Sequence, residues 1–150
     1  MSDELNTGLL MFIAYRSAEN RIIDAVRRAG YTDFTLAQAR IIARIGPQGT
    51  RLSDLAEQAQ VAKQTATVLV DRLERAGYVE RTVDPTDGRA RLVRIAPRGA
   101  EAVPIARAEE ARIEAEWTHH LGTRRMRQLR EALTLLRDIT DPYQASPSST

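Results

Sequence analysis

The spacing of apolar residues predicts a chain made mostly of helices. These residues recur every three or four positions over long stretches, a period that places them on one face of a helix. From Leu5 to Arg28, for example, they stand at positions 5, 9, 12, 13, 23 and 26. The pattern predicts helices over about residues 5–28, 35–45, 54–58, 63–76 and 98–120, and a last helix that begins at Thr123.

Capping and breaking residues support these boundaries. Thr35 followed three residues later by Gln38 forms a capping box. Ser53 is a suitable N-cap for the short helix that follows it, and Gly77 is expected to end the longer helix before it. Pro104 should either kink the long fifth helix or mark its true start.

One segment departs from the helical pattern. Residues 83–95 read VDPTDGRARLVRI, in which turn-forming residues precede an alternation of arginines with apolar residues. The alternation predicts a hairpin with strands over 78–83 and 89–95. The two helices before it, joined by a turn over 59–62, have helix-turn-helix spacing. The chain is therefore expected to be mainly α with a small β-hairpin wing (α+β), that is, a winged helix-turn-helix.

Composition narrows the class of protein. A chain of 150 residues with 43% hydrophobic residues is long enough for one domain or for two lobes that share a core. It has no cysteine, which excludes disulfides, thiolate zinc sites and thiol redox sensing. The N-terminus is acidic, and the apolar run from Leu9 to Tyr15 is too short to span a bilayer. We expect a cytoplasmic protein with no membrane partner.

The distribution of charge says more than the net charge of +2. From Arg81 to Arg98 there are five arginines against two acids, whereas from Gly99 onward there are seven arginines against eight acids. A basic surplus concentrated at the hairpin favours a polyanionic partner. A soluble surface with uneven charge is the alternative.

The helix over 63–76 has a face suited to reading DNA. At about 100° per residue, Ala66, Leu69, Val70 and Leu73 cluster toward the core, so the opposite side faces outward. That side carries Gln64, which can pair with adenine, and Val68, whose methyl groups can meet the thymine methyl. Lys63, Arg72 and Arg75 are suited to phosphates. A plain solvent-exposed helix is the alternative.

The hairpin tip suggests a second contact with DNA. An arginine on a projecting tip can enter a narrow minor groove, where the negative potential is strong. Arg89 is the best candidate, Asp87 could hold its guanidinium in place, and Arg91 could reach a phosphate. Charged residues that merely protect a sheet edge are the alternative. The complete set of expected DNA contacts is Ser53, Lys63, Gln64, Thr65, Thr67, Val68, Arg72, Arg75, Asp87, Arg89 and Arg91.

Two stretches carry a family resemblance: LSDLAEQAQVAKQTATVLVDRLERAGYVER and DPTDGRARLVRIAPRG. With the order of the flanking helices they resemble the MarR family of bacterial transcription regulators over about residues 9–140. The most specific part is Asp87-x-Arg89 with Leu92, Ile95 and Gly99 at the family spacing. Three residues depart from the usual pattern: Ala62 replaces a capping Ser or Thr, and Val68 and Gly88 each replace a frequent arginine. These departures bear on the operator sequence and not on the fold.

The resemblance implies a homodimer that binds a palindromic operator in double-stranded DNA, usually as a repressor. It implies a helical dimerisation lobe over residues 1–34 and 98–142, and a winged helix-turn-helix lobe over 35–97. Residues 143–150 would form a flexible tail. Release by a small effector, often an aromatic or phenolic acid, is also implied.

The last helix supports pairing of two chains, because its leucine stripe is too apolar for a surface helix. Burial inside a monomer is the alternative, although a palindromic operator requires two recognition helices. The residues expected at the dimer interface are Leu9, Ile13, Trp117, Leu129, Leu133 and Leu136.

Polar residues interrupt the apolar face of the first helix. Arg16 and Asn20 fall where apolar residues are expected, and a buried polar group needs a partner. One reading is an effector site in which Arg16 pairs with an anion beside Phe12 and Tyr15. The other, which we favour, is an ion pair with an acid of the partner chain.

Enzymatic and metal-dependent functions find no support. The sequence has no phosphate-binding glycine loop, nucleophile elbow or His-Glu metal motif. His119 and His120 are adjacent and point about 100° apart on a helix, so they cannot share one ion unaided. We expect no metal, no cofactor and no enzyme activity. The remaining rival function is a winged helix that binds protein instead of DNA. Separately, Arg124 and Arg125 in the last helix have no functional explanation.

Overall fold

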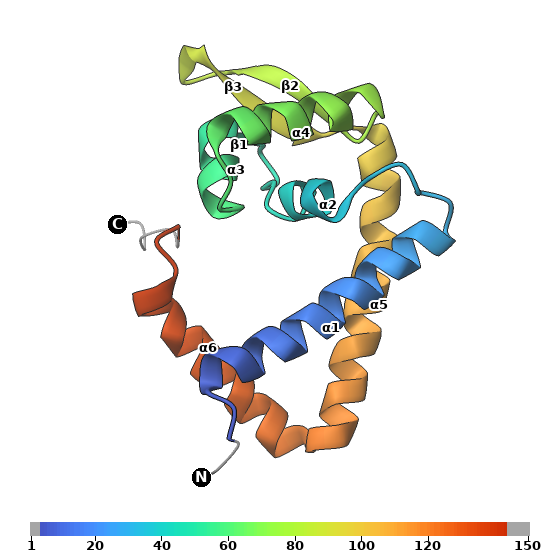
Figure 1. Cartoon of the computed structure of the whole chain (residues 1–150), viewed down its shortest axis with the longest axis vertical. Helices are drawn as coiled ribbons and strands as arrows, with labels where there is room; N and C mark the ends of the chain where they lie inside the picture. Colours follow the sequence, from blue (N-terminus) through green and yellow to red (C-terminus); the bar gives the residue numbers. More distant parts are fainter. Residues whose placement is uncertain (1–3, 144–150) are drawn as a thin grey trace. The chain divides into compact units, whose positions relative to one another are not determined.

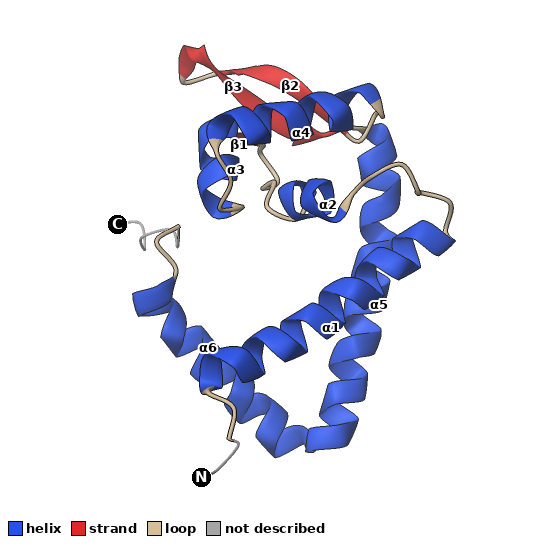
Figure 2. Cartoon of the chain, in the orientation of Figure 1, coloured by secondary structure: helices blue, strands red, loops and turns tan. Residues whose placement is uncertain are grey.

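The computed structural model describes residues 4–143 of the chain. In this part the order of elements is α1 (Thr7–Arg28), α2 (Leu36–Ile42), β1 (Thr50–Arg51), α3 (Leu52–Gln58), α4 (Lys63–Arg75), β2 (Val79–Asp84), β3 (Asp87–Ile95), α5 (Pro97–Leu121) and α6 (Thr123–Thr140) (Figures 1 and 2). The expected fold class is confirmed, because helices dominate and the strands form one small sheet. Of the expected tail, residues 144–150 lie outside the described part.

The chain divides into two compact units, residues 1–110 and 111–150. The first contains α1 to α4, the sheet and the beginning of α5; the second contains the remainder of α5 and α6. Within the described residues, no helix is both long enough and apolar enough to cross a membrane.

Local signals in the sequence set most helix boundaries. At α2 the Thr35 hydroxyl accepts a hydrogen bond from the Gln38 backbone N–H, and the Gln38 side chain accepts one from the Thr35 N–H, so the expected capping box is confirmed. The helix ends at Ile42, earlier than expected. The N–H groups of Arg44 and Ile45 bond to carbonyls three residues back, a tighter turn that closes the helix. Helix α4 ends as expected before Gly77, which has φ +85°.

The sheet has three antiparallel strands in the order β1-β3-β2. Strand β1 was not foreseen, because two residues are too short to show an alternation. Its partners on β3 are Leu92 and Val93. Strand β3 begins at Asp87. Asp87 and Gly88 therefore belong to the strand, although the sequence predicts that both lie in the turn. The turn at the tip consists of Pro85 and Thr86. We call β2 and β3 together the wing.

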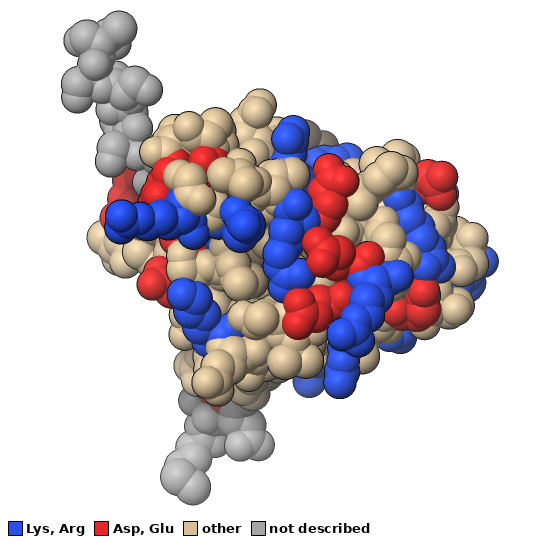
Figure 3. Space-filling view, turned by 90° about the horizontal axis from the view of Figure 1, so that it is seen from above, with Lys and Arg blue, Asp and Glu red and all other residues tan. Residues whose placement is uncertain are grey.

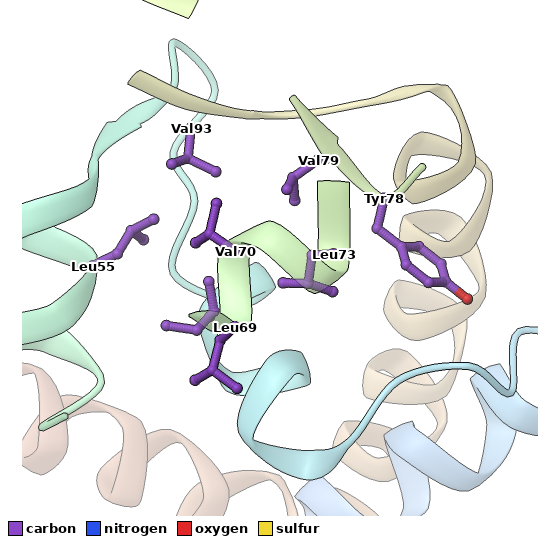
Figure 4. Close-up of a cluster of buried hydrophobic side chains, with 8 residues drawn as sticks. Leu55, Leu69, Val70, Leu73, Tyr78, Val79 and Val93 are labelled. Carbon is purple, nitrogen blue, oxygen red and sulfur yellow. The ribbon is translucent and has the colours of Figure 1, made fainter. Parts of the chain in front are cut away.

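The core of the first unit lies between α4 and the sheet. Leu69, Val70 and Leu73 of α4 are buried together with Val79 of β2 and Val93 of β3 (Figure 4). Burial of each such side chain contributes about 1.5–3 kcal/mol. Other members of the cluster are Ile41, Leu55 and Tyr78. The inward face that the sequence predicts for α4 is confirmed.

A polar cluster surrounds Tyr78 at the end of this core. The Tyr78 hydroxyl donates to Asp33 Oδ1 at 2.5 Å, and Arg98 donates to Asp33 Oδ2 at 2.6 Å. The Arg98 guanidinium also lies over the Tyr78 ring, 4.6 Å from its centre. Burial and the hydrogen bond to Asp33 raise the pKa of Tyr78 to about 12. The cluster connects the loop before α2 to the first turn of α5.

Helix α5 runs without interruption from Pro97 through Pro104. The alternative in which Pro104 marks the start of the helix is therefore wrong, because the first turn begins at Pro97, where a missing N–H is harmless. In the second unit, Arg130 of α6 donates to Glu114 of α5 at 3.3 Å. Helix α6 begins at Thr123 as expected.

The first turn of α5 passes close to the core, which makes Gly99 sensitive to substitution. A Cβ at position 99 would collide with the carbonyl oxygen of Tyr78, which cannot retreat because it accepts a hydrogen bond from Ala96 at 2.9 Å. We expect Gly99→Ala to lower the free energy of unfolding by about 1–3 kcal/mol, as measured by urea denaturation. Gly88→Ala is the control, since nothing lies within 4 Å of its Cβ position. Equal stability of the two variants would contradict the prediction.

Candidate nucleic-acid interface

The outward face of α4 is open to solvent. Gln64 and Thr65 are exposed near its N-terminus, and Val68 keeps 48% of its surface exposed. Lys63, Arg72 and Arg75 are also exposed. Thr67 is half-buried, and its hydroxyl donates to the Lys63 carbonyl at 2.9 Å. The structure therefore places the expected base-reading and phosphate-binding side chains of α4 on one accessible helix.

Asp71, on the same helix, is not a free acid on this face. Arg81 of β2 donates to Asp71 Oδ1 at 2.5 Å and to Glu74 Oε1 at 3.0 Å. The backbone N–H of Arg81 also donates to Glu74 at 3.0 Å. These bonds connect α4 to the wing and offset two negative charges beside the expected DNA contacts. Sequence reasoning missed this role of Arg81, although two acids three residues apart before a basic strand are a signal for it.

The N-terminus of α4 has no side-chain cap. Ala62 occupies the N-cap position with φ −63° and ψ 146°, the extended conformation of an N-cap residue. The first N–H groups of a helix lack carbonyl partners within the helix, and together with the helix dipole they attract anions. The exposed side chains of Lys63, Gln64 and Thr65 surround this end.

The wing presents its arginines as expected, but Asp87 acts differently. Arg89 and Arg91 are both exposed on β3. Asp87 Oδ1 accepts a hydrogen bond from the backbone N–H of Arg89 at 3.0 Å, so the carboxylate shapes the strand beside the tip. The expectation that Asp87 holds the Arg89 guanidinium is replaced by this backbone contact.

Ser53 does not cap α3. The helix begins one residue before it, at Leu52, and the N-cap residue is Arg51, which makes no side-chain cap. Ser53 is instead exposed within the first turn. The reason is that β1 leads directly into the helix, so the extended residue at the junction is Arg51.

Acidic and basic side chains are interspersed when the molecule is viewed from above (Figure 3). The basic residues do not form one unbroken field in that view, and several acids lie beside them (Figure 3). Two basic residues next to the expected DNA contacts form ion pairs: Arg81 with Asp71, and Arg51 with Asp84. On such a surface the positive charge is confined to separate side chains and does not form a continuous patch.

The four residues expected to bind an effector lie on α1 and are all exposed. The Arg16 guanidinium lies over the ring of Phe12, 5.5 Å from its centre. The Tyr15 hydroxyl donates to Glu19 Oε2 at 2.6 Å, and Glu19 also accepts from Arg40 of α2 at 2.9 Å. The bond from Arg40 connects α2 to α1, whereas the bond from Tyr15 lies within α1. Asn20 completes the set of four.

Apolar side chains expected at a dimer interface are uncovered in each unit. On α1, Leu9 and Ile13 are 40% and 36% exposed. On α6, Leu129, Leu133 and Leu136 are 38–40% exposed. Trp117 of α5 is half-buried. A groove of about 780 Å³ also lies between the parts of α5 and α6 that belong to the second unit, and it includes Met126 and Leu135. Such faces are costly in water.

Among the described residues, no three acids or histidines are grouped to hold a metal ion. His119 and His120 are exposed side by side at the end of α5.

Comparison with known proteins agrees with this geometry. A model of the MarR family matches residues 32–90, from the loop before α2 to the beginning of β3. The HTH-type transcriptional regulator BilQ of Clostridioides difficile (strain CD3) is 30% identical over 70 residues. That alignment covers 47% of this chain and 45% of BilQ, so it spans less than half of the curated relative.

Solved structures extend the likeness to most of the chain. The crystal structure of MarR is 26% identical, covers 89% of this chain and 96% of its own, and superposes with a TM-score of 0.70. NadR, solved in complex with 4-hydroxyphenylacetate, is 24% identical, with 93% and 97% coverage and a TM-score of 0.69; at this identity the likeness shows the fold alone. The expected winged helix-turn-helix is confirmed.

The missing cap of α4 leads to a stability prediction. Ala62→Ser places a hydroxyl where it can accept from the second or third N–H of the helix, in a backbone conformation that already suits a cap. We expect the free energy of unfolding to rise by about 1 kcal/mol, measured by urea denaturation. Ala62→Val, which offers no acceptor, is the control. A Ser variant no more stable than the Val variant would show that the cap does not form.

Proposed function

We propose that the chain is a transcriptional regulator of the MarR family that binds a specific sequence of double-stranded DNA, because a model of that family matches residues 32–90 and the structure of MarR superposes on most of the chain. The proteins it resembles are named as transcriptional regulators and not as enzymes. The observation that carries the proposal is the outward face of α4, where exposed Gln64 and Val68 lie between cationic residues. We further propose that it acts in the cytoplasm, as a repressor.

In this function α4 enters the major groove. Gln64 reads an adenine and Val68 meets a thymine methyl group, with Thr65 and Thr67 beside them. Lys63, Arg72 and Arg75 bind phosphates, which sets affinity and register. The uncapped N–H groups at the start of α4 add a further attraction for a phosphate. Ser53, exposed in the first turn of α3, completes the phosphate contacts.

The wing supplies the second contact. Arg89 stands next to the tip turn and enters the minor groove beside the site read by α4, while Arg91 binds a phosphate. Asp87 contributes by holding the backbone of Arg89. Because the three bonds from Arg81 connect the wing to α4, the two contacts are made at a set spacing.

We propose that two copies of the chain pair through a dimerisation lobe formed by residues 1–34 and 98–142, leaving residues 35–97 for DNA. The exposed leucines of α6 and the exposed apolar residues of α1 support this. A homodimer with twofold symmetry presents two copies of α4, which calls for a palindromic operator with half-sites about one helical turn apart.

We further propose that a small anionic or aromatic effector controls DNA binding. NadR has been solved with a phenolic acid bound, and α1 of this chain carries Phe12, Tyr15, Arg16 and Asn20 on its exposed surface. The competing role of Arg16, an ion pair with the partner chain, is separated from effector binding by Arg16→Ala. Loss of the effector response with an intact dimer supports effector binding, whereas loss of the dimer supports the ion pair.

A winged helix that binds protein remains the rival function. It calls for an apolar or acidic face on α4 and no arginine beside the wing tip, and the exposed Lys63, Gln64 and Arg89 argue against it. The discriminating experiment is fluorescence anisotropy with DNA from the upstream region of its own gene and with scrambled DNA, across a salt series. The proposal expects roughly a thousandfold preference for the upstream DNA and a steep loss of affinity with salt. Weak, equal binding to both would favour the rival.

Two variants separate base reading from general affinity. Gln64→Ala should cost about 1–3 kcal/mol on the specific site and relax selection at one base step. Arg89→Ala should weaken binding to many sequences and reduce the preference for A·T-rich flanks. Arg125→Ala, an exposed arginine of α6 outside α4 and the wing, is the control. If Gln64→Ala weakened specific and random DNA by the same factor, Gln64 would not read a base.

The proposed dimer is tested by size-exclusion chromatography with light scattering. The wild-type chain should have the mass of a dimer at micromolar concentration. Leu133→Glu should weaken pairing by on the order of a hundredfold, because it puts an unpaired carboxylate into an apolar interface. Arg124→Glu changes the charge of the same helix outside the leucine stripe and should leave pairing unchanged. A monomeric wild-type chain would exclude the dimer.

A further inference from the structure

The junction between β1 and α3 carries an arginine that helix capping does not explain. Arg51 is the N-cap residue of α3 and makes no side-chain cap. An arginine has no acceptor for the free N–H groups of a helix, and its charge opposes the positive end of the helix dipole. The local requirements of α3 thus favour Ser, Thr, Asp or Asn at this position.

The Arg51 side chain instead reaches the wing. Its Nε donates to Asp84 Oδ2 at 2.7 Å. Asp84 is the last residue of β2, and only 5% of its surface is exposed. The bond therefore connects the beginning of α3 to the outer part of the wing, across 33 positions of sequence.

The other oxygen of the same carboxylate holds the tip turn. Asp84 Oδ1 accepts from the Thr86 backbone N–H at 2.8 Å and from the Thr86 hydroxyl at 2.7 Å. These two bonds have the largest effect, and the bond from Arg51 a smaller one, in keeping the pKa of Asp84 below its usual range. One carboxylate thus joins two structures: the turn at the wing tip and the start of α3.

The wing requires support at this point. Strand β1 pairs with β3 only at Leu92 and Val93, so the wing has two strands from Arg91 outward. The register of β2 and β3 also shifts between Val83 and Asp84. A two-stranded hairpin is marginally stable by itself. Asp84 lies where the backbone ladder is weakest.

We propose that Arg51 is a positioning residue for the wing, which through Asp84 holds the tip so that Arg89 and Arg91 meet DNA in a fixed place. This inference rests on the proposed DNA-binding function. Arg51 need not touch DNA for this role. Its contribution is preorganisation, since a tip that is already held loses less conformational freedom on binding.

The decisive variant is Arg51→Ser, because it removes the tie to the wing and at the same time offers α3 a cap that it lacks. The melting temperature should therefore stay the same or rise. Amide hydrogen exchange at the tip, residues 86–89, should become about tenfold faster. Affinity for the upstream DNA should fall about tenfold.

A second variant isolates the ion pair from the tip turn. Asp84→Asn keeps an acceptor at Oδ1 for Thr86 but replaces Oδ2 by an amide that cannot accept from Arg51. It should reproduce the faster exchange at residues 87–89 and the tenfold loss of affinity. If Asp84→Asn and Arg51→Ser left exchange unchanged, the positioning role would be excluded, whatever the DNA affinity.

Combination with Arg89→Ala and Arg91→Ala distinguishes positioning from direct contact. If Arg51 acts through the tip, Arg51→Ser has less than a twofold further effect once both wing arginines are gone. An unchanged tenfold effect in that background would show that Arg51 binds a phosphate itself and would overturn the proposal. A wild-type chain that binds upstream and scrambled DNA equally would instead refute the proposed function, and the DNA role of Arg51 with it, even if tip exchange responded as expected.

Discussion

Burial of one face of α4 is the constraint on which the rest of the first unit depends. Leu69, Val70 and Leu73 are almost completely enclosed by residues of the sheet and of α2 and α3. Any rotation of the helix that moved Gln64 inward would expose these side chains, at about 1.5–3 kcal/mol each. The identity of the outward residues therefore follows from the apolar ones, and the same core that stabilises the fold also selects the surface proposed to read DNA.

Polar contacts then position the wing relative to that helix. The core holds the inner part of the wing through Val79 and Val93, which stand six and seven positions from the tip turn and do not hold the tip itself. Further out, Arg81 connects β2 to α4, and Asp84 connects the end of β2 to Arg51. Partly exposed ion pairs add little to stability. Their value here is geometric, since planar guanidinium groups accept few arrangements.

Most of this fold could be predicted from sequence, because residues close together in the chain determine where most of its helices begin and end. The α4 boundaries followed from apolar spacing and Gly77, and the start of α2 from its capping box. What could not be predicted depends on partners distant in the chain. No residue near Arg51 in the sequence indicates that its side chain pairs with Asp84, 33 positions away. The local sequence therefore favours Ser53 as the N-cap of α3. In the wing, the sequence allows Asp87 to accept a hydrogen bond either from the Arg89 side chain or from the Arg89 backbone N–H. The strand conformation decides in favour of the backbone N–H. A two-residue strand such as β1 leaves no pattern at all.

If two chains pair as proposed through the apolar surfaces left open on α1 and α6, that pairing also bears on the choice of DNA sequence. A winged helix reads only a few base pairs with one α4, and each mismatched pair costs about 1–3 kcal/mol, so a single copy discriminates weakly. A twofold dimer doubles the number of contacts and adds a requirement for half-site spacing that neither copy imposes alone. In the proposed dimer the exposed leucines of α6, although they touch no base, would contribute to specificity as directly as the proposed contact of Gln64. In the proposed dimer, a substitution that changes how two chains pair would therefore change which operator fits, even with every side chain proposed to face DNA unaltered.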